Sequence, residues 1–309
     1  MILTVTPNPA LDYTLRLDAV EIGRRAKYRE TTIDPSGKGN NVARMIRRLG
    51  EPVLALGFAG GPTGDLLEAG LAREGVPCAL VRVAALTRIN VTLLTGPEGV
   101  ATHLHGPGAG VTDEDVDRLR TLVAERLAGA RLLVLSGSLP PGMQPADAAA
   151  LLRLARERRV PTLVDAEGEV LRAAIAEKPA LVKPNLAEAA GLLGRPLAGR
   201  DDAIAAAREL GGSVVITMGG EGAVAVREGR AWSVAPPRED VVRAVGAGDS
   251  FAAGLAVGLV RKLSFPDTLR LAAAAGAATA LCPGTGLGRK EDVDRLLPQV
   301  QVQEEGGKP

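Results

Sequence analysis

The chain has 309 residues, 46% of them hydrophobic, which is enough for one large α/β domain or two small ones with a sizeable core. Its 37 basic and 36 acidic residues give a net charge of +1, so no field of one sign points to a nucleic acid or an anionic membrane. Aromatic residues make up only 2%, which disfavours proteins that stack bases on aromatic side chains.

The start of the chain and its cysteines indicate a cytoplasmic protein. Met1 leads directly into a strand-like run without a basic leader, and no apolar run approaches the roughly 18 residues of a membrane span. Cys78 and Cys282 lack CxxC spacing, and we interpret both as small buried hydrophobic residues in a reducing compartment.

Short apolar strands and amphipathic helices alternate along most of the chain, which predicts a mostly parallel sheet covered by helices. Strands are expected at 2–6, 53–59, 77–83, 132–135, 160–165, 181–183 and 213–217, with a hairpin over 223–234. Helices are expected after 41, at 65–73, 112–127, 145–158, 169–176, after 185, at 201–210, after 248 and at 266–281.

Two further segments, 13–34 and 87–106, alternate apolar and polar residues, which predicts half-exposed strands of a small accessory sheet. The polar end of the chain, 302–309, is expected to be a disordered tail. No low-complexity linker divides the sequence, so we expect one domain over 1–309.

Polar residues near the N-terminal half of the sheet are the first candidates for a ligand site. Asp12 follows the first strand, where open α/β sheets place ligands, although a loop Asp that caps a turn explains it equally well. Arg88, Asn90 and His103 project from the accessory hairpin. They are either solvated or, in the case of Arg88, suited to bidentate contact with a phosphate.

The segment SGKGNN, residues 36–41, is a glycine-rich turn that opens an amphipathic helix. Its glycines allow close approach of the backbone, Lys38 supplies a cation, and the helix N-terminus adds its dipole, so the turn predicts an anion or sugar site. It is not a phosphate-binding Walker A loop, because the spacing differs. Asn40 stands where an apolar residue is expected.

In KPNLAE, Asn185 and Glu188 lie three residues apart at the start of a helix. Their oxygens suit a hydrated Mg²⁺, but the same pair can form a helix cap without any metal.

In VGAGDS, Gly246, Ala247 and Gly248 form a turn whose amides can face an anion. Asp249 at the following helix start is either a helix cap or a functional carboxylate.

The segments SGKGNNVAR, TRINV, SGSLPPG, KPNLAE, TMGGEGA and VGAGDS occur in this order over nearly the whole length. Together they resemble the ribokinase-like sugar kinases of the phosphofructokinase B type, and within them 1-phosphofructokinases and tagatose-6-phosphate kinases. The resemblance implies a three-layer αβα fold with a mostly parallel central sheet and a small β lid. It also implies ATP and Mg²⁺ as cofactors.

The resemblance also implies roles for individual residues. Asp249 is the expected general base, with Gly246, Ala247 and Gly248 as the anion hole, and Gly248 also touching the nucleotide. The expected sugar-phosphate residues are Asp12, Gly37, Lys38, Gly39, Asn41, Arg88, Asn90, Ser136, Ser138 and His103. The expected nucleotide residues are Thr217, Gly219, Glu221 and Gly222, and those linked to Mg²⁺ are Asn185 and Glu188.

The expected activity is phosphorylation of a ketohexose phosphate by ATP, foremost fructose 1-phosphate to fructose 1,6-bisphosphate. Tagatose 6-phosphate and fructose 6-phosphate remain alternative acceptors, because His103 occupies a variable lid position. A different class of function, a non-catalytic sensor of sugar phosphates or nucleotides, uses the same fold. A homodimer through the lid strands is a further expectation.

Overall fold

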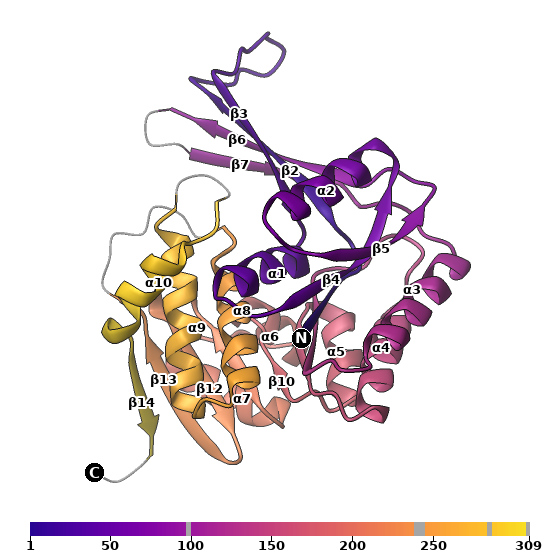
Figure 1. Ribbon diagram of the computed structural model, residues 1–309. Coiled ribbons are helices and arrows are strands. Elements are labelled where there is room, and N and C mark those ends of the chain that lie inside the picture. The colour runs from indigo at the N-terminus through magenta and orange to yellow at the C-terminus, as the bar shows by residue number, and fades with distance from the viewer. Residues whose placement is uncertain (97–99, 238–244, 283–285, 307–309) are drawn as a thin grey trace.

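A central sheet of ten strands runs through the molecule in a computed structural model that describes residues 1–96, 100–237, 245–282 and 286–306 (Figure 1). Its strand order is β14-β13-β12-β11-β10-β9-β8-β1-β4-β5. The parallel strands are β1 (Ile2–Thr6), β4 (Val53–Gly60), β5 (Cys78–Val83), β8 (Leu132–Ser136), β9 (Thr162–Asp165), β10 (Leu181–Val182) and β11 (Val214–Thr217). The antiparallel strands are β12 (Ala223–Arg227), β13 (Arg230–Ala235) and β14 (Gln301–Glu305).

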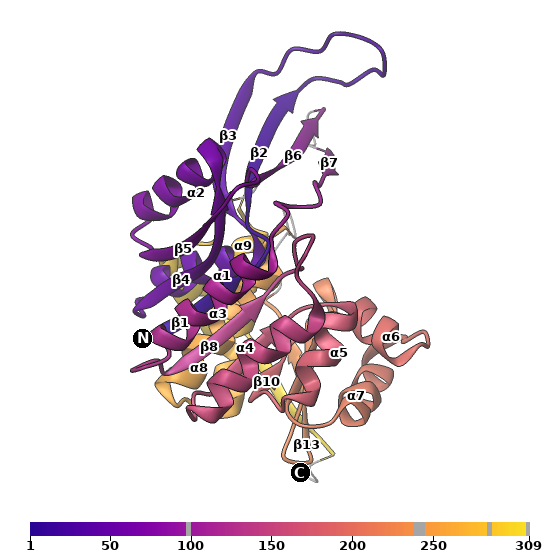
Figure 2. The ribbon, with the colours of Figure 1, turned by 90° about the vertical axis from the view of Figure 1, so that its right-hand side faces the viewer.

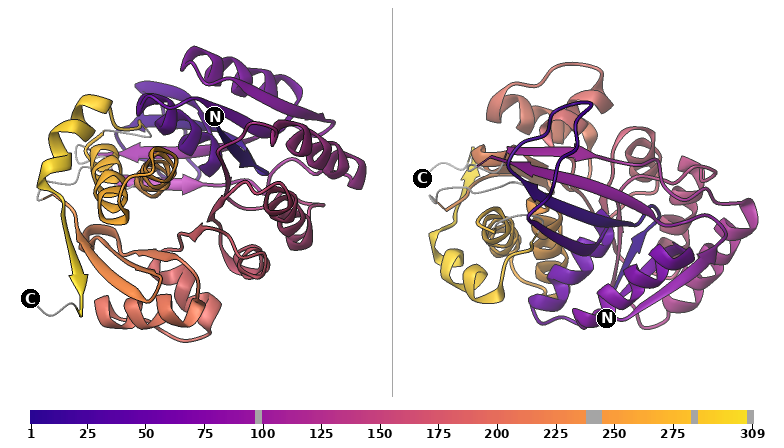
Figure 3. Two further views of the ribbon diagram at one scale, coloured as in Figure 1. Left: turned by 60° about the horizontal axis from the view of Figure 1, so that its bottom comes forward. Right: turned by 90° about the horizontal axis from the view of Figure 1, so that it is seen from above.

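Helices cover both faces of this sheet and bury two separate apolar clusters against it (Figure 3). One face carries α1 (Lys38–Arg48), α2 (Gly61–Arg73), α8 (Ala247–Arg261), α9 (Phe265–Ala280) and α10 (Lys290–Leu296). The other carries α3 (Asp113–Arg126), α4 (Pro145–Glu157), α5 (Gly168–Ala176), α6 (Leu186–Leu193) and α7 (Gly199–Leu210). The predicted three-layer αβα fold is therefore confirmed.

Four strands form a second, smaller sheet that stands out from the body (Figure 2). Its order is β3-β2-β6-β7, built from β2 (Ala10–Leu17), β3 (Glu30–Ser36), β6 (Arg88–Thr95) and β7 (Val100–Leu104). We call these four strands the small sheet. They fall within or next to the two segments whose alternating pattern predicted accessory strands.

The C-terminal segment differs from its prediction. The polar run was expected to be disordered from residue 302, but Gln301–Glu305 form β14, which pairs with β13 along its whole length. Val302 packs on the core, and neighbouring Glu304 forms an ion pair with Arg230. Backbone pairing at the sheet edge orders a segment whose side chains alone do not predict a strand. Residues 307–309 lie outside the described part.

Two smaller features complete the fold. Cys78 and Cys282 are free and half-buried, not fully buried as expected. In the part of the chain that the structure describes, no helix is both long and apolar enough to cross a membrane.

Candidate active site

Polar residues gather where the parallel strands end. Ser136, Asp165 and Thr217 are the last residues of β8, β9 and β11, and Lys183 directly follows β10. The chain leaves β1 toward β4 on one side and later returns to β8 on the other, so the strand order reverses here. Crevices at such reversals are the usual ligand sites of open α/β sheets.

Asp249 does not cap its helix. The residue before α8 is Gly246, with a φ of 77° that suits glycine, and Asp249 is the third helical residue without a cap hydrogen bond. Its buried carboxylate instead accepts a hydrogen bond at Oδ2 from Nδ2 of Asn41 in α1, at 2.9 Å. The interpretation of Asp249 as the helix cap is therefore wrong, and its carboxylate faces α1.

The surroundings of Asp249 prepare it to accept a proton near neutral pH. Burial, together with the nearby Asp165 carboxylate, raises the pKa of Asp249 to about 7. The hydrogen bond from Asn41 and the ammonium groups of Lys38 and Lys183 oppose this rise. A carboxylate with such a pKa suits general base catalysis at physiological pH.

The N-terminus of α8 offers backbone amides to an anion. Ala247, Gly248 and Asp249 are its first three residues, and the leading N–H groups of a helix have no acceptor within that helix. Their positive partial charge favours a phosphate group. Ala247 and Gly248 also line a cavity beside α8.

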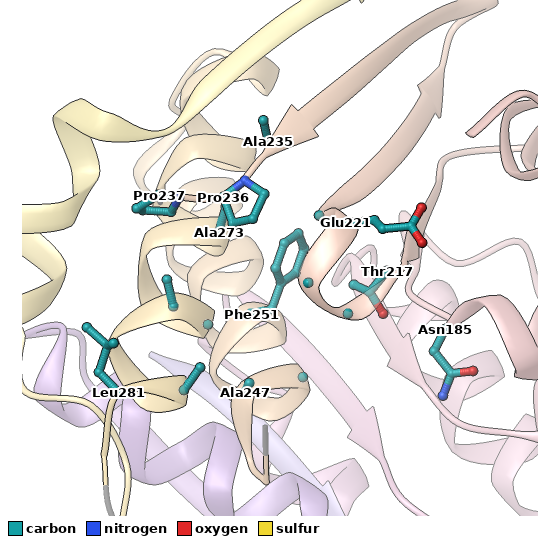
Figure 4. Close-up of a pocket in the computed structure, with 17 residues that line it drawn as sticks. Asn185, Thr217, Glu221, Ala235, Pro236, Pro237, Ala247, Phe251, Ala273 and Leu281 are labelled. Atoms are coloured by element: carbon teal, nitrogen blue, oxygen red, sulfur yellow. The ribbon is translucent and has the colours of Figure 1, made fainter. Parts of the chain in front are cut away.

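A cavity of about 730 Å³ lies between α8, α9 and the β11–β12 turn. The predicted nucleotide residues Thr217, Gly219, Glu221 and Gly222 all line it, together with Asn185. Figure 4 shows polar Asn185, Thr217 and Glu221 on one side and apolar Pro237 and Leu281 on the other. Its size and mixed lining suit a molecule as large as a nucleotide.

Phe251 and Gly222 also line this cavity. Phe251, in α8, projects into it and was not among the predicted site residues. At Gly222, with a φ of 92°, a Cβ would stand 1.9 Å from the Val234 carbonyl oxygen. Close packing against β13 therefore requires this glycine, whatever binds in the cavity.

In the small sheet, Asp12 belongs to β2 and does not cap a loop. Its Oδ2 accepts a hydrogen bond from the Ser36 hydroxyl at 2.7 Å, and its Oδ1 accepts one from Nδ2 of Asn90 at 2.9 Å. The Oδ1 of Asn90 is buried and has no hydrogen-bond partner among the described residues. Strands β2, β3 and β6 thus bring a carboxylate and an unpaired acceptor together.

The glycine turn of residues 36–41 packs its helix closely on β1. Gly37 precedes α1 with a φ of 101°, and a Cβ on Gly39 would stand 2.4 Å from the Thr6 Oγ1 atom. The buried amide of Asn40 accepts from the Thr6 hydroxyl at 3.2 Å and donates to the Ser36 carbonyl at 2.9 Å. A polar residue occurs at position 40 because it ties the turn to the strand.

Lys38 in α1 contacts carboxylates from two other elements. Its Nζ lies 3.4 Å from Glu188 Oε1 and 3.8 Å from Asp165 Oδ1. Burial alone would lower the pKa of Lys38, but the charges of Asp165 and Glu188 outweigh this effect and hold the pKa above its usual value. Lys38 therefore remains a cation at neutral pH.

The two basic candidates of the small sheet differ in their contacts. Arg88 donates from its terminal nitrogens to the carbonyls of Gly106 and Asn8, both at 2.9 Å, and its buried Nε has no partner among the described residues. The ring of His103 is exposed, and its Nδ1 lies 3.1 Å from the Thr92 hydroxyl. Strand register places His103 on the same face as Asn90.

Asn185 and Glu188 form a helix cap, which is one of the two interpretations of this pair. Asn185 Oδ1 accepts from the Glu188 amide, and Glu188 Oε2 accepts from the Asn185 amide, both at 2.8 Å. The second carboxylate oxygen of Glu188 faces Lys38. Within the described ranges, no group of three or more His, Cys, Asp or Glu side chains is placed to hold a metal.

Comparison with known proteins identifies the family. The sequence pattern of the pfkB family of carbohydrate kinases matches residues 7–292. The chain belongs to this family. It is 33% identical to a 1-phosphofructokinase of Vibrio cholerae over 97% of this chain and 96% of that protein. It is 29% identical to a tagatose-6-phosphate kinase of Staphylococcus epidermidis over 98% and 99%.

A solved structure of a related kinase has the same fold as this chain. Phosphofructokinase-2 from Escherichia coli, crystallised with potassium, superposes with a TM-score of 0.92 at 34% identity and covers 96% of this chain and 98% of its own. The protein is therefore an ATP-dependent carbohydrate kinase.

This kinase also contains charged site residues that sequence reasoning missed. Asp165 is almost fully buried, and its Oδ1 lies 3.2 Å from Nζ of Lys183. Its Oδ2 accepts a hydrogen bond from the Ser136 hydroxyl at 3.4 Å. The Ser138 hydroxyl accepts a hydrogen bond from Nδ2 of Asn8 at 3.2 Å. Asp165 ends a buried strand, so like Asp12 it lies where open α/β sheets place ligands, and this position is the sequence signal for it.

Proposed function

We propose that the kinase transfers the γ-phosphoryl group of ATP to fructose 1-phosphate and forms fructose 1,6-bisphosphate. The observation that carries this proposal is the position of Asp249. Its buried carboxylate contacts α1 on the sugar side and belongs to the first turn of α8, whose Ala247 and Gly248 line the nucleotide cavity. Relatives named 1-phosphofructokinase over almost the full chain support the choice of acceptor.

In this mechanism the acceptor hydroxyl gives its proton to Asp249 while its oxygen attacks the γ-phosphorus. The bond from that phosphorus to the bridging oxygen breaks, and ADP leaves with the electron pair. The amides of Ala247 and Gly248 stabilise the charge on the transferring group. Phosphoryl transfer of this kind needs positioning and charge more than covalent help from the protein.

The sugar phosphate has acceptors and cations available on its side of the site. The Asp12 carboxylate and the unpaired Oδ1 of Asn90 accept hydrogen bonds from sugar hydroxyls. Lys38 and Arg88 supply positive charge for the substrate phosphate, and His103 offers it a ring nitrogen. The backbone of Gly37 and Gly39, with Asn41, Ser136 and Ser138, completes the sugar side in this proposal.

The donor set of α6 fits a hydrated Mg²⁺ carried mainly by the nucleotide phosphates. Glu188 offers a carboxylate oxygen beyond the one used in its cap, and Asn185 lines the nucleotide cavity. These two residues would hold the ion through its water molecules, and the ion would neutralise charge on the phosphates. The nucleotide itself contacts Thr217, Gly219, Glu221, Gly222 and Gly248.

The small sheet acts as the lid of a single kinase domain in this proposal. It carries Asp12, Asn90 and His103 and is attached to the body through Arg88 and Asn8. A lid that closes over bound sugar excludes water, which would otherwise accept the phosphoryl group.

The acceptor is tested by measuring ADP release with three sugar phosphates. We expect kcat/KM for fructose 1-phosphate to exceed that for tagatose 6-phosphate and for fructose 6-phosphate by at least about tenfold, a difference of about 1.4 kcal/mol in transition-state binding. A reversed order would assign the enzyme to another acceptor. Binding of all three without any turnover would indicate the non-catalytic sensor.

We also propose that two copies pair through the small sheet. Ile33, Ile89, Val100 and Leu104 are large apolar side chains exposed on its strands. Burying such a surface in a symmetric dimer removes it from water. Sedimentation equilibrium should give the mass of a dimer for the wild type and of a monomer for Ile89→Lys, whereas a monomeric wild type would contradict the pairing.

A further inference from the structure

The side-chain amide of Asn41 has a charged group on each side. Its Nδ2 donates to Oδ2 of Asp249 at 2.9 Å, and its Oδ1 accepts from a terminal nitrogen of Arg44 at 3.1 Å. A guanidinium group has only donors, so the oxygen of the amide must face Arg44. The NH₂ group is thereby directed at Asp249.

Arg44 is itself held rigidly. It is only 2% exposed, and it donates to Oε1 of Glu74 at 2.8 Å and to the Pro35 carbonyl at 2.9 Å. Glu74 also accepts from Arg48 at 2.9 Å. The two arginines lower the pKa of Glu74 against the effect of its burial, so the carboxylate stays ionised and the cluster stays charged.

We propose that Arg44 is a positioning residue for the reaction, because it locks the Asn41 amide so that this amide can only donate to Asp249. The proposal rests on the proposed function of Asp249 as the base. Arg44 acts through Asn41 and does not itself touch the substrates.

Holding the Asn41 amide in one orientation affects the two protonation states of Asp249 differently. An ionised carboxylate accepts the Asn41 hydrogen bond, whereas a protonated one would need an acceptor for its O–H. Without Arg44 the amide can turn over and offer its oxygen to the protonated acid. Arg44 denies the acid this partner and so favours the ionised, basic form.

Other groups around Asp249 do not depend on Arg44. Lys38 from α1 and Lys183 after β10 face it as cations, and Asp165 at the end of β9 faces it as an anion. These charges remain when Arg44 is replaced, so a change in the titration of Asp249 reports the amide.

The first test is the pH profile of kcat/KM in Arg44→Met. We expect the midpoint of the acid limb to rise by about one pH unit, the size of one hydrogen bond to the acid, with the alkaline plateau largely kept. Activity near pH 7 should therefore fall about fivefold and recover at about pH 9. A lowered plateau with an unmoved midpoint would show a purely structural role and overturn the proposal.

Two matched variants distinguish loss of the hydrogen bond between Arg44 and Asn41 from a general loss of structure. Glu74→Gln removes the other half of the buried ion pair but keeps the contact of Arg44 with Asn41, so its midpoint should stay at the wild-type value. Adding Arg44→Met to Asn41→Ala should move the midpoint no further than Asn41→Ala alone. An equal shift with and without Asn41 would overturn the proposal.

A third measurement needs no turnover. The raised folded-state pKa of Asp249 stabilises the protonated native protein, and this contribution is lost as pH rises from about 4 toward 7. Asp249→Asn should therefore gain in Tm over the wild type across this range and level off above about pH 7. When Arg44→Met is added to both proteins, the Tm difference between them should level off at a pH about one unit higher.

This Tm comparison distinguishes failure of the two proposals. If no sugar phosphate is turned over, the proposed function fails. The pH at which the Tm difference levels off still decides whether Arg44 controls the orientation of the Asn41 amide. If Arg44→Met does not fold, Arg44→Met with Glu74→Met replaces it in both tests, because it removes both partners of the close Arg44–Glu74 ion pair together. An unchanged midpoint and unchanged levelling overturn the proposal.

Discussion

Asp249→Asn is expected to lower kcat at least about 100-fold, which is the scale of general base catalysis. The amide has nearly the shape of the carboxylate and can still bond to Asn41, but it cannot take the proton of the sugar hydroxyl. Because the helix amides of Ala247 and Gly248 are retained, ATP affinity should change little. Steady-state kinetics and calorimetric titration with ATP measure the two quantities.

Asp117→Asn is the matched control for Asp249→Asn, because Asp117 lies on the exposed side of α3 in an ion pair with Arg120. Exposed pairs of this kind contribute little, so its kcat should equal that of the wild type. Near-normal turnover by Asp249→Asn would remove Asp249 from the chemistry.

Lys38→Met is expected to lower kcat/KM for the sugar phosphate about 100-fold, mainly through KM. The substitution removes a partly buried cation and leaves Asp165 and Glu188 facing the substrate phosphate as anions. Truncating one partner of a buried charge pair typically costs about 3 kcal/mol, which corresponds to this factor. Initial rates with varied sugar phosphate, and separately with varied ATP, measure the effect.

Lys290→Met serves as the control for Lys38→Met, since Lys290 lies on the surface of α10 in a pair with Asp294. It should leave both KM values unchanged. A rise confined to the KM for ATP in Lys38→Met would assign Lys38 to the nucleotide and contradict its proposed contact with the sugar phosphate.

Much of the fold was predictable because its elements carry their own signals. The strands of the parallel sheet are short, mostly apolar and buried runs, and β4, β8, β9 and β10 are each followed along the chain by a helix. The short α10 and the edge strand β14 lack such signals. Both are stabilised by tertiary contacts, through Val293 and Leu296 in the core and through backbone pairing with β13.

The sequence motifs indicate candidate site residues, but they do not reveal the contacts between those residues. The contact between Asn41 and Asp249 joins residues 208 positions apart, and no local pattern reveals it. The pKa of Asp249 depends on burial under other elements, so the sequence alone suggested no more than a helix-capping carboxylate or a base. The sequence places Arg44 only within an amphipathic helix, and its hydrogen bond to Asn41 becomes visible in the folded structure.

The proposed role of Asp249 as the base is tested most directly by comparing kcat/KM against pH for the wild type and Asp249→Asn with fructose 1-phosphate. The wild type should rise with pH and level off above about pH 7, because Asp249 must lose its proton before it can accept another. Asp249→Asn should lack this rise, apart from the substrate's own phosphate ionisation near pH 6. The same profile in both proteins would show that Asp249 is not the base.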